Sequence, residues 1–231
     1  MRKHLRTLLA CVIATVALGT VTACSGGSGT TANSPTPSSS AAVVKDFPKS
    51  ARYIADIPMA DGKTMTIGVS VEGDKIAAYA CDGIKDEAWF FGTQKDGALA
   101  ITSKYQDTLK ASFNGTAVDG QLNMNDVNYT FTAASVPSPA GMYTAAANGV
   151  RASWVVRPDN TITGVQFKTS NDSDPSDLVQ ANEQKFRDQV RQRRQARLLQ
   201  PAPPLEFGTW RSTVNGVPVT AIVVNGDTRL G

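Results

Sequence analysis

The chain has 231 residues, of which 23 are Lys or Arg, 20 are Asp or Glu, three are Cys and one is His. The histidine is His4, which lies in a segment that we expect to be removed, so the mature chain would contain none. A Ser-His-Asp triad, a Cys-His pair and a histidine-ligated zinc or iron site all need an imidazole, so these are excluded for the mature protein. Cleavage before residue 24 would leave 208 residues with 20 basic and 20 acidic side chains. This neutral balance gives no support for nucleic-acid binding.

The first residues have the pattern of an export signal. A basic stretch, Arg2–Arg6, precedes the uncharged and mostly apolar run 8–21, which is too short for a bilayer span of about 20 residues. The run ends in Val21-Thr22-Ala23-Cys24, which resembles a bacterial lipobox, where the cysteine is acylated and the bond before it is cut. We therefore expect 1–23 to be a lipoprotein signal peptide and Cys24 to carry the lipid. An ordinary secretory signal with a coincidental cysteine is the alternative.

Residues 24–48 combine the lipidated cysteine with a linker rich in Ser, Thr, Pro and Gly. Such a composition cannot bury a core, and about 24 flexible residues have a typical reach of ~25–30 Å. The expected product is a domain tethered to the outer face of the cytoplasmic membrane or to the cell envelope by acyl chains.

From about residue 51 onward, apolar and polar residues alternate with period two between turn signals, which is typical of half-buried strands. Gly-containing pairs supply the positive φ angles of tight hairpin turns, and they predict reversals at 72–74, 82–83, 96–97, 114–115 and 119–120. The alternation resumes after Pro139 and again after Thr209, and the predicted hairpins there turn at 158–160 and 215–216. We expect residues 49–231 to be one mainly β domain, an antiparallel meander that forms a small barrel or sandwich. The later strands are expected to complete the same sheet system.

Short strings in this body carry a family resemblance. They are Tyr79–Gly83, Glu87–Trp89, Phe131–Ala133, Gly141–Tyr143, Ser153–Val156 and Val214–Gly216. Together they resemble a β-rich module of exported actinobacterial, especially mycobacterial, proteins. The resemblance covers most of 64–225, rests on turns and core aromatics, and implies no catalytic residue. The segment at about 170–206 looks inserted.

The insert predicts one long basic helix near the C-terminus. Ser173–Asp177 is a good helix start, and the following run has no Gly or Pro until Pro201, so we expect a helix over about 176–199. Its apolar stripe ends halfway, which predicts that the second half projects from the body. Its arginines are a candidate contact for an anionic lipid or an acidic envelope polymer: Arg187, Arg191, Arg193, Arg194 and Arg197. A solvated helix without a partner and a protein-docking helix are the alternatives.

Three functions compete for the β body. A non-catalytic binding or interaction module is the main expectation, with no cofactor and no metal. A carrier could shelter an apolar ligand among five aromatic side chains, although these could equally fill the core: Trp89, Phe91, Phe113, Tyr129 and Phe131. A carboxylate-based hydrolase of envelope glycans would use Asp82, Asp86 and Glu87, which read first as turn residues.

Cys81 has no partner once Cys24 is acylated, and we expect it to be buried; an intermolecular disulfide or a reactive thiol is the alternative.

Overall fold

The structure is a computed structural model that describes residues 44–168, 183–197 and 199–230. The predicted signal peptide, the lipidation site Cys24, most of the linker and the predicted helix start at Ser173–Asp177 therefore lie outside the described residues. All three apolar clusters are built from residues between Phe47 and Leu230. The described part of the chain therefore contains its own core.

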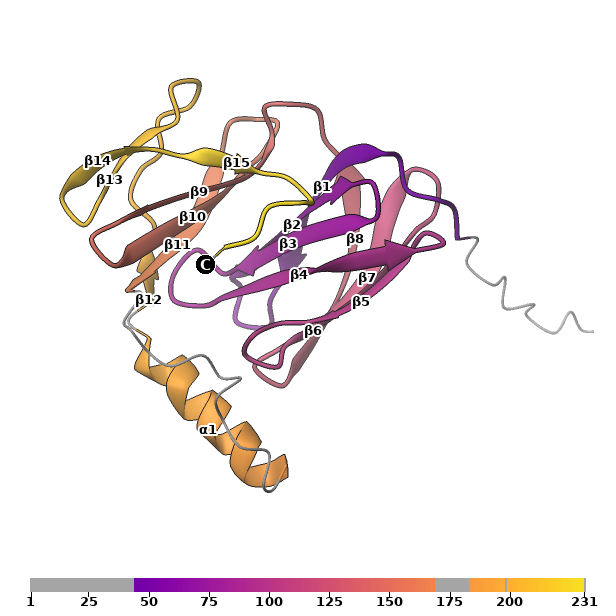
Figure 1. Ribbon diagram of the computed structural model, residues 1–231, viewed down its shortest axis with the longest axis horizontal. Helices are drawn as coiled ribbons and strands as arrows, with labels where there is room; N and C mark the ends of the chain where they lie inside the picture. Colours follow the sequence, from indigo (N-terminus) through magenta and orange to yellow (C-terminus); the bar gives the residue numbers. More distant parts are fainter. Residues whose placement is uncertain (1–43, 169–182, 198, 231) are drawn as a thin grey trace, which may run out of the picture. The chain divides into compact units, whose positions relative to one another are not determined.

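Eight strands form a closed antiparallel barrel (Figure 1). Each strand pairs with its neighbour in sequence, and the last strand closes the barrel by pairing with the first. The mainly β prediction, with a barrel as one of its two forms, is therefore confirmed. The strands are β1 (Ser50–Pro58), β2 (Thr64–Glu72), β3 (Lys75–Cys81), β4 (Glu87–Lys95), β5 (Ala98–Thr102), β6 (Thr108–Phe113), β7 (Ala117–Met124) and β8 (Val127–Ser135).

The predicted turn at 119–120 is wrong. Asp119 and Gly120 lie inside β7, where Gly120 pairs with Ala111 on one side and Phe131 on the other. A Cβ at Gly120 would lie 2.4 Å from Cζ of Phe131, so the glycine makes room for an aromatic ring that packs over it. The chain reverses five residues later instead, where Asn125 and Asp126 have positive φ angles.

The barrel interior is filled by one cluster of apolar side chains from all eight strands. It includes Phe113, which stacks on Phe47 at a centroid distance of 5.2 Å and lies 5.8 Å from the ring of Tyr53. Strand alternation explains the cluster, because every second residue of a half-buried strand points to the same side.

The later strands do not complete the barrel, contrary to the prediction. They form a separate five-stranded sheet in the order β12-β11-β10-β9-β15, and a two-stranded hairpin of β13 and β14. A closed barrel has no free edge for another strand to join, so additional strands must pair with one another. These strands are β9 (Gly141–Ala147), β10 (Val150–Val156), β11 (Ile162–Lys168), β12 (Leu199–Pro201), β13 (Arg211–Val214), β14 (Val217–Thr220) and β15 (Ile222–Val224).

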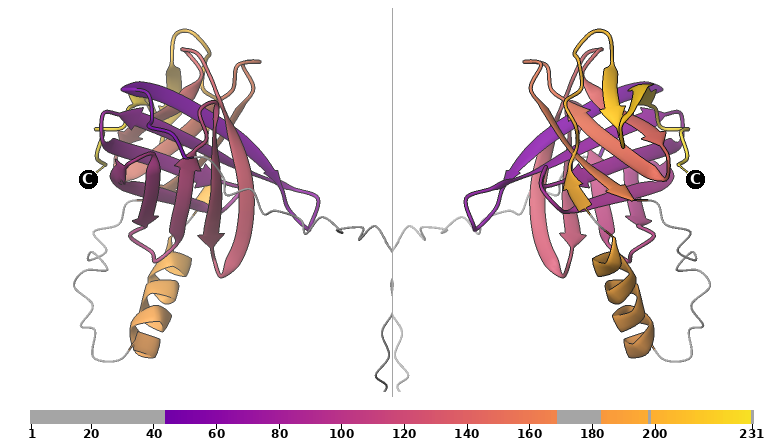
Figure 2. Two further views of the ribbon diagram at one scale, coloured as in Figure 1. Left: turned by 90° about the vertical axis from the view of Figure 1, so that its right-hand side faces the viewer. Right: turned by 90° about the vertical axis from the view of Figure 1, so that its left-hand side faces the viewer.

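The second sheet packs against the outer face of β1–β4, and Figure 2 shows it from two further sides. The outward side chains Tyr79 and Cys81 of β3 are fully buried beneath it. Gly68 lies at the closest approach, since a Cβ there would be 2.6 Å from Cγ of Met142 in β9. Both faces of β3 are thus covered, which explains why its sequence is apolar from Ile76 to Cys81.

The prediction of one long basic helix over about 176–199 is wrong. The structure has a helix of only 14 residues, α1 (Glu183–Ala196). It ends before Arg197, which is buried and pairs with the β body. No helix in the described ranges has the length and apolar character needed to cross a bilayer.

Candidate anion-binding pocket

Glu87 is the first residue of β4 and is 1% exposed. Ala88 and Phe90 of the same strand belong to the barrel interior. Because side chains alternate between the two faces of a strand, Glu87 and Trp89 point to the outer face. There the second sheet covers them. A carboxylate is thereby placed in the interface between the barrel and the sheet, away from water.

Two arginines from distant parts of the chain reach this carboxylate. Arg197, directly after α1, donates a hydrogen bond of 2.7 Å from Nη2 to Oε1 of Glu87. Arg151 of β10 places its own Nη2 3.6 Å from the same oxygen. The second carboxylate oxygen accepts a hydrogen bond of 3.0 Å from the hydroxyl of Tyr79. Both oxygens of Glu87 are therefore engaged by buried donors.

Aromatic rings surround the two guanidinium groups. The guanidinium carbons of Arg197 and Arg151 lie 3.8 Å and 4.3 Å from the ring centroid of Phe167 in β11. The guanidinium carbon of Arg197 also lies 4.8 Å from the ring centroid of Tyr105, and that of Arg151 lies 5.9 Å from the ring centroid of Trp89. Cation–π contacts of this kind contribute about 0.5–2 kcal/mol each, and they fix the planes of the guanidinium groups.

These groups line a cavity of about 460 Å³, here called the head cavity. It lies between the start of β4, the β5–β6 loop, the start of β10 and the end of β11. The charged residues of its lining are four cations and one carboxylate: Glu87, Lys104, Arg151, Lys168 and Arg197. Among its described lining residues, cations thus outnumber carboxylates, and part of the wall is aromatic.

Three buried N–H donors at this wall have no hydrogen-bond acceptor within the described ranges. They are Nε1 of Trp89 and the Nε atoms of Arg151 and Arg197. Leaving such a donor unsatisfied costs about 1–3 kcal/mol, and more for a charged group. All three donors belong to side chains that line the head cavity.

The electrostatic environment of Arg151 also favours an anionic ligand. Burial lowers the pKa of the Arg151 guanidinium; the carboxylate of Glu87 opposes this, and the charge of Arg197 adds to it. A guanidinium nevertheless stays protonated in proteins, so the lowered pKa marks a cation in an unfavourable environment. Burial also raises the pKa of Tyr79 well above its usual value, so its hydroxyl keeps the proton that it donates to Glu87.

The three carboxylates considered for a hydrolase do not form one site. Asp82 Oδ1 accepts hydrogen bonds of 2.8 Å from the backbone N–H groups of residues 84, 85 and 86, which is a turn function. Asp86 Oδ2 accepts a hydrogen bond from the side-chain amide of Asn125. Only Glu87 lines the head cavity, where two arginines hold it.

The five aromatic residues considered for an apolar ligand are divided between two faces. Phe113, Tyr129 and Phe131 belong to the packed barrel interior, whereas Trp89 and Phe91 lie on the outer face. The predicted common lining is therefore wrong. Trp89 and Phe91 stack at 5.5 Å with nearly parallel rings and line the head cavity.

The five arginines considered for an anionic partner do not form one surface either. Arg187 is exposed and Arg193 is half-buried on α1, but Arg197 is buried against Glu87. The side chains of Arg191 and Arg194 lie outside the described set. Arg197 is thus paired with a carboxylate of the same chain, and the contact of this set with an anionic partner stays a prediction.

Cys81 is fully buried, as predicted, and burial raises the pKa of its thiol to about 12.

Within the described ranges there is no group of three or more His, Cys, Asp or Glu side chains that could hold a metal ion.

The chain matches no protein-family model, no curated protein and no solved structure. The resemblance to an actinobacterial exported module therefore stays a prediction from its short strings, and the functional argument rests on the pocket.

Sequence reasoning did not identify Arg151, Tyr105 or Phe167 as parts of a site. One signal was available for Glu87: in an alternating strand it falls on the same face as Trp89 and Phe91, which is an unusual place for a charge beside large apolar groups. Its partners are 64 and 110 positions away, and no local pattern could identify them.

Proposed function

We propose that this protein is a lipid-anchored envelope protein that acts as a non-catalytic binding module. The anchor is Cys24, and the binding site is the head cavity. The ligand is a small molecule with an anionic group beside an apolar or aromatic part. The single observation that carries this proposal is the pair of largely buried guanidinium groups that share one carboxylate and have N–H donors without an acceptor among the described residues.

Charge balance supports an anionic ligand. Moving an ion out of water has an effective penalty of several kcal/mol, which a partner of opposite charge must offset. Glu87 offsets the charge of Arg197 at 2.7 Å, but it lies 3.6 Å from Arg151 and can neutralise only one of the two. A carboxylate or phosphate bound in the head cavity beside Arg151 would neutralise the second.

A binding role is favoured over hydrolysis by the state of the carboxylate. Glu87 is 1% exposed, and its two oxygens already accept hydrogen bonds from Tyr79 at 3.0 Å and from Arg197 at 2.7 Å. General acid or base work needs a carboxyl group within reach of the reacting proton.

Phenyl phosphate is the appropriate first probe, because it joins a dianion to a ring that can stack on the Trp89–Phe91 wall. The protein is the predicted mature chain, residues 24–231, with Cys24→Ser to keep it unacylated. Isothermal titration calorimetry should detect phenyl phosphate binding, weaker binding of inorganic phosphate, and no binding of the neutral benzyl alcohol.

The decisive variant is Arg151→Met, which leaves the Glu87–Arg197 pair in place. It should weaken phenyl phosphate binding about tenfold or more, since hydrogen bonds to charged groups contribute about 1.5–3 kcal/mol. Arg211→Met, an exposed arginine on β13, is the matched control and should bind as the parent does. Equal binding by the Arg151→Met variant, or no binding by the parent, would overturn the proposal.

A further inference from the structure

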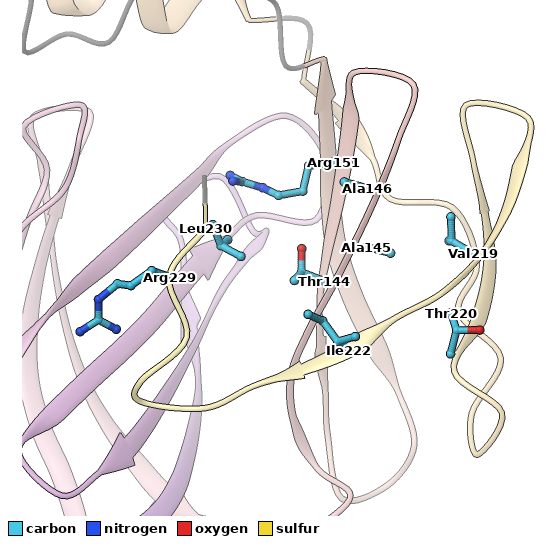
Figure 3. A pocket seen from close by; sticks show the side chains of 9 residues that line it. All are labelled: Thr144, Ala145, Ala146, Arg151, Val219, Thr220, Ile222, Arg229 and Leu230. Carbon is cyan, nitrogen blue, oxygen red and sulfur yellow. The ribbon is translucent and has the colours of Figure 1, made fainter.

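A second cavity of about 470 Å³ adjoins the head cavity and is here called the tail cavity (Figure 3). It lies between β9, the end of β14, the start of β15 and the C-terminal residues Arg229 and Leu230. Small and branched apolar side chains make up much of its lining: Ala145, Ala146, Val219, Ile222 and Leu230. The described residues of its lining include no carboxylate.

The two cavities meet at two shared residues, Arg151 and Leu230. In Figure 3 the side chain of Arg151 extends above Leu230, and Ala145 and Val219 lie to the right of both. The guanidinium of Arg151 faces Glu87 in the head cavity, so its aliphatic stem forms the boundary between the two spaces. A ligand bound to this guanidinium thus has an apolar path beside it.

Leu230 belongs to the C-terminal strap, residues 225–230, which crosses from β15 to the barrel. Arg229 holds this strap, because its guanidinium donates to the backbone carbonyl oxygens of Gly226 at 2.9 Å and Thr228 at 2.7 Å. It also lies 5.6 Å from the ring of Phe91. Arg229 lines the tail cavity, but its guanidinium is hydrogen-bonded within the strap. The cation that faces a ligand where the two cavities meet is therefore Arg151.

Ile222 provides an independent indication that the tail cavity takes an apolar group. It is 60% exposed, the most exposed of the large apolar side chains in the described ranges, although it lies in a strand that pairs with β9. Ala146, which also lines this cavity, is exposed as well. An alkyl chain that lies between them would remove both from water.

We propose that the head and tail cavities together bind one anionic amphiphile. Its acidic head lies at Arg151 and Arg197, and its single alkyl chain passes Leu230 and lies along Ala146 and Ile222. This inference rests on the proposed function, because it uses the same head site. The shared chemistry is a carboxylate or phosphate with one alkyl chain, as in a fatty acid or an alkyl phosphate.

The test compares chain length at a constant head. Ethyl phosphate and decyl phosphate, and in a second series acetate and decanoate, are titrated below their micelle concentrations into the unacylated mature chain. The long member of at least one series should bind at least tenfold more tightly than the short one. The series with the larger gain identifies the head that the site prefers.

A double variant, Ala146→Gln with Ile222→Gln, isolates the tail cavity. Both positions are exposed, so the fold should tolerate the change, and near-ultraviolet circular dichroism checks that it does. The variant should lose most of the chain-length gain and keep the affinity for phenyl phosphate. Val127→Gln, at another exposed apolar position on β8, should keep both.

Two outcomes separate the inference from the proposed function. If phenyl phosphate binds and chain length has no effect, or if the double variant keeps the full gain, the tail cavity is not used and the inference fails alone. If no phosphate or carboxylate binds the parent, the proposed function fails and the inference fails with it.

Discussion

Arg197 donates a hydrogen bond of 2.7 Å to Glu87 across 110 positions of the chain, and both side chains are buried. The contact joins the residue after α1 to the first residue of β4. It therefore fastens the end of the helical insert to the barrel, and it places a cation where the second sheet brings another. One ion pair thus contributes both to the fold and to the proposed site.

Replacing Glu87 should strongly destabilise the protein. Glu87→Gln leaves two buried guanidinium groups without a carboxylate, and breaking a buried ion pair typically lowers the free energy of unfolding by about 3–5 kcal/mol. Urea denaturation measures the change. Glu72→Gln, at the exposed end of β2, is the control and should unfold near the parent midpoint.

A double-mutant cycle assigns that loss to the pair with Arg197. The combined change Glu87→Gln with Arg197→Met should cost less than the sum of the single changes, with a coupling energy of about 0.5–3 kcal/mol. Strictly additive single changes would show that the two side chains do not interact in solution.

The packing of Phe131 over Gly120 predicts a clash. A methyl group at Gly120 would lie 2.4 Å from Cζ of Phe131 inside the closed barrel, where the ring has little room to move. Gly120→Ala should therefore lower the free energy of unfolding by about 1–3 kcal/mol. Adding Phe131→Leu should relieve the clash, so that Gly120→Ala costs less in that background. An equal cost in both backgrounds would contradict the predicted contact.

The Asp56–Arg157 pair should make the protein sensitive to acid. Arg157 donates to both carboxylate oxygens, at 2.8 Å and 2.7 Å, and this pairing lowers the pKa of Asp56. A lowered pKa gives stability that is present above the ordinary value of 3.8 and is lost as the pH falls through the folded-state pKa. Because Asp56 is partly exposed, Asp56→Asn should cost at most about 1 kcal/mol at pH 7.

The difference between the parent and Asp56→Asn should shrink when the pH is lowered below about 4, because the parent then loses the same charge. Asp61→Asn, which removes a fully exposed pair with Lys63, is the control and should change nothing measurable at either pH. A constant difference between pH 7 and pH 3 would show that the Asp56 effect is not electrostatic.

The thiol of Cys81 should be unreactive in the folded protein. Its raised pKa should also lower the stability of the folded protein at high pH. Its thiol pKa is raised from 9.0 to about 12 by burial, so the unfolded chain loses this proton first. Stability is then fully present below pH 9 and falls as the pH rises from 9 toward 12. Burial raises the pKa of Tyr79 too, which acts in the same direction.

Iodoacetamide at pH 8 checks the thiol directly in the Cys24→Ser chain, where Cys81 is the one remaining cysteine of the mature protein. Labelling should occur in urea and be slow without it. In the variant Cys81→Ala, the fall in stability above pH 9 should be less steep. Rapid labelling of the native protein would contradict the buried position.

The strands and most turns could be predicted from the sequence because they depend on neighbours in the chain. The alternation of Met65, Ile67 and Val69 predicts an inward face, and the reversals at 72–74 and 96–97 follow from glycines that adopt positive φ. The prediction failed at 119–120, where the same Asp-Gly signal occurs inside a strand because Phe131 needs the space above Gly120.

The sequence by itself determined the alternating strands, the inward core of the barrel and the burial of Cys81, because periodicity and turn chemistry are local properties. Only the tertiary structure decided that the barrel closes, that a second sheet covers its outer face, and that the helix is short. The same holds for the head cavity. Glu87, Arg151 and Arg197 come from three separate segments, and only the packing of the sheet on the barrel brings their charges together.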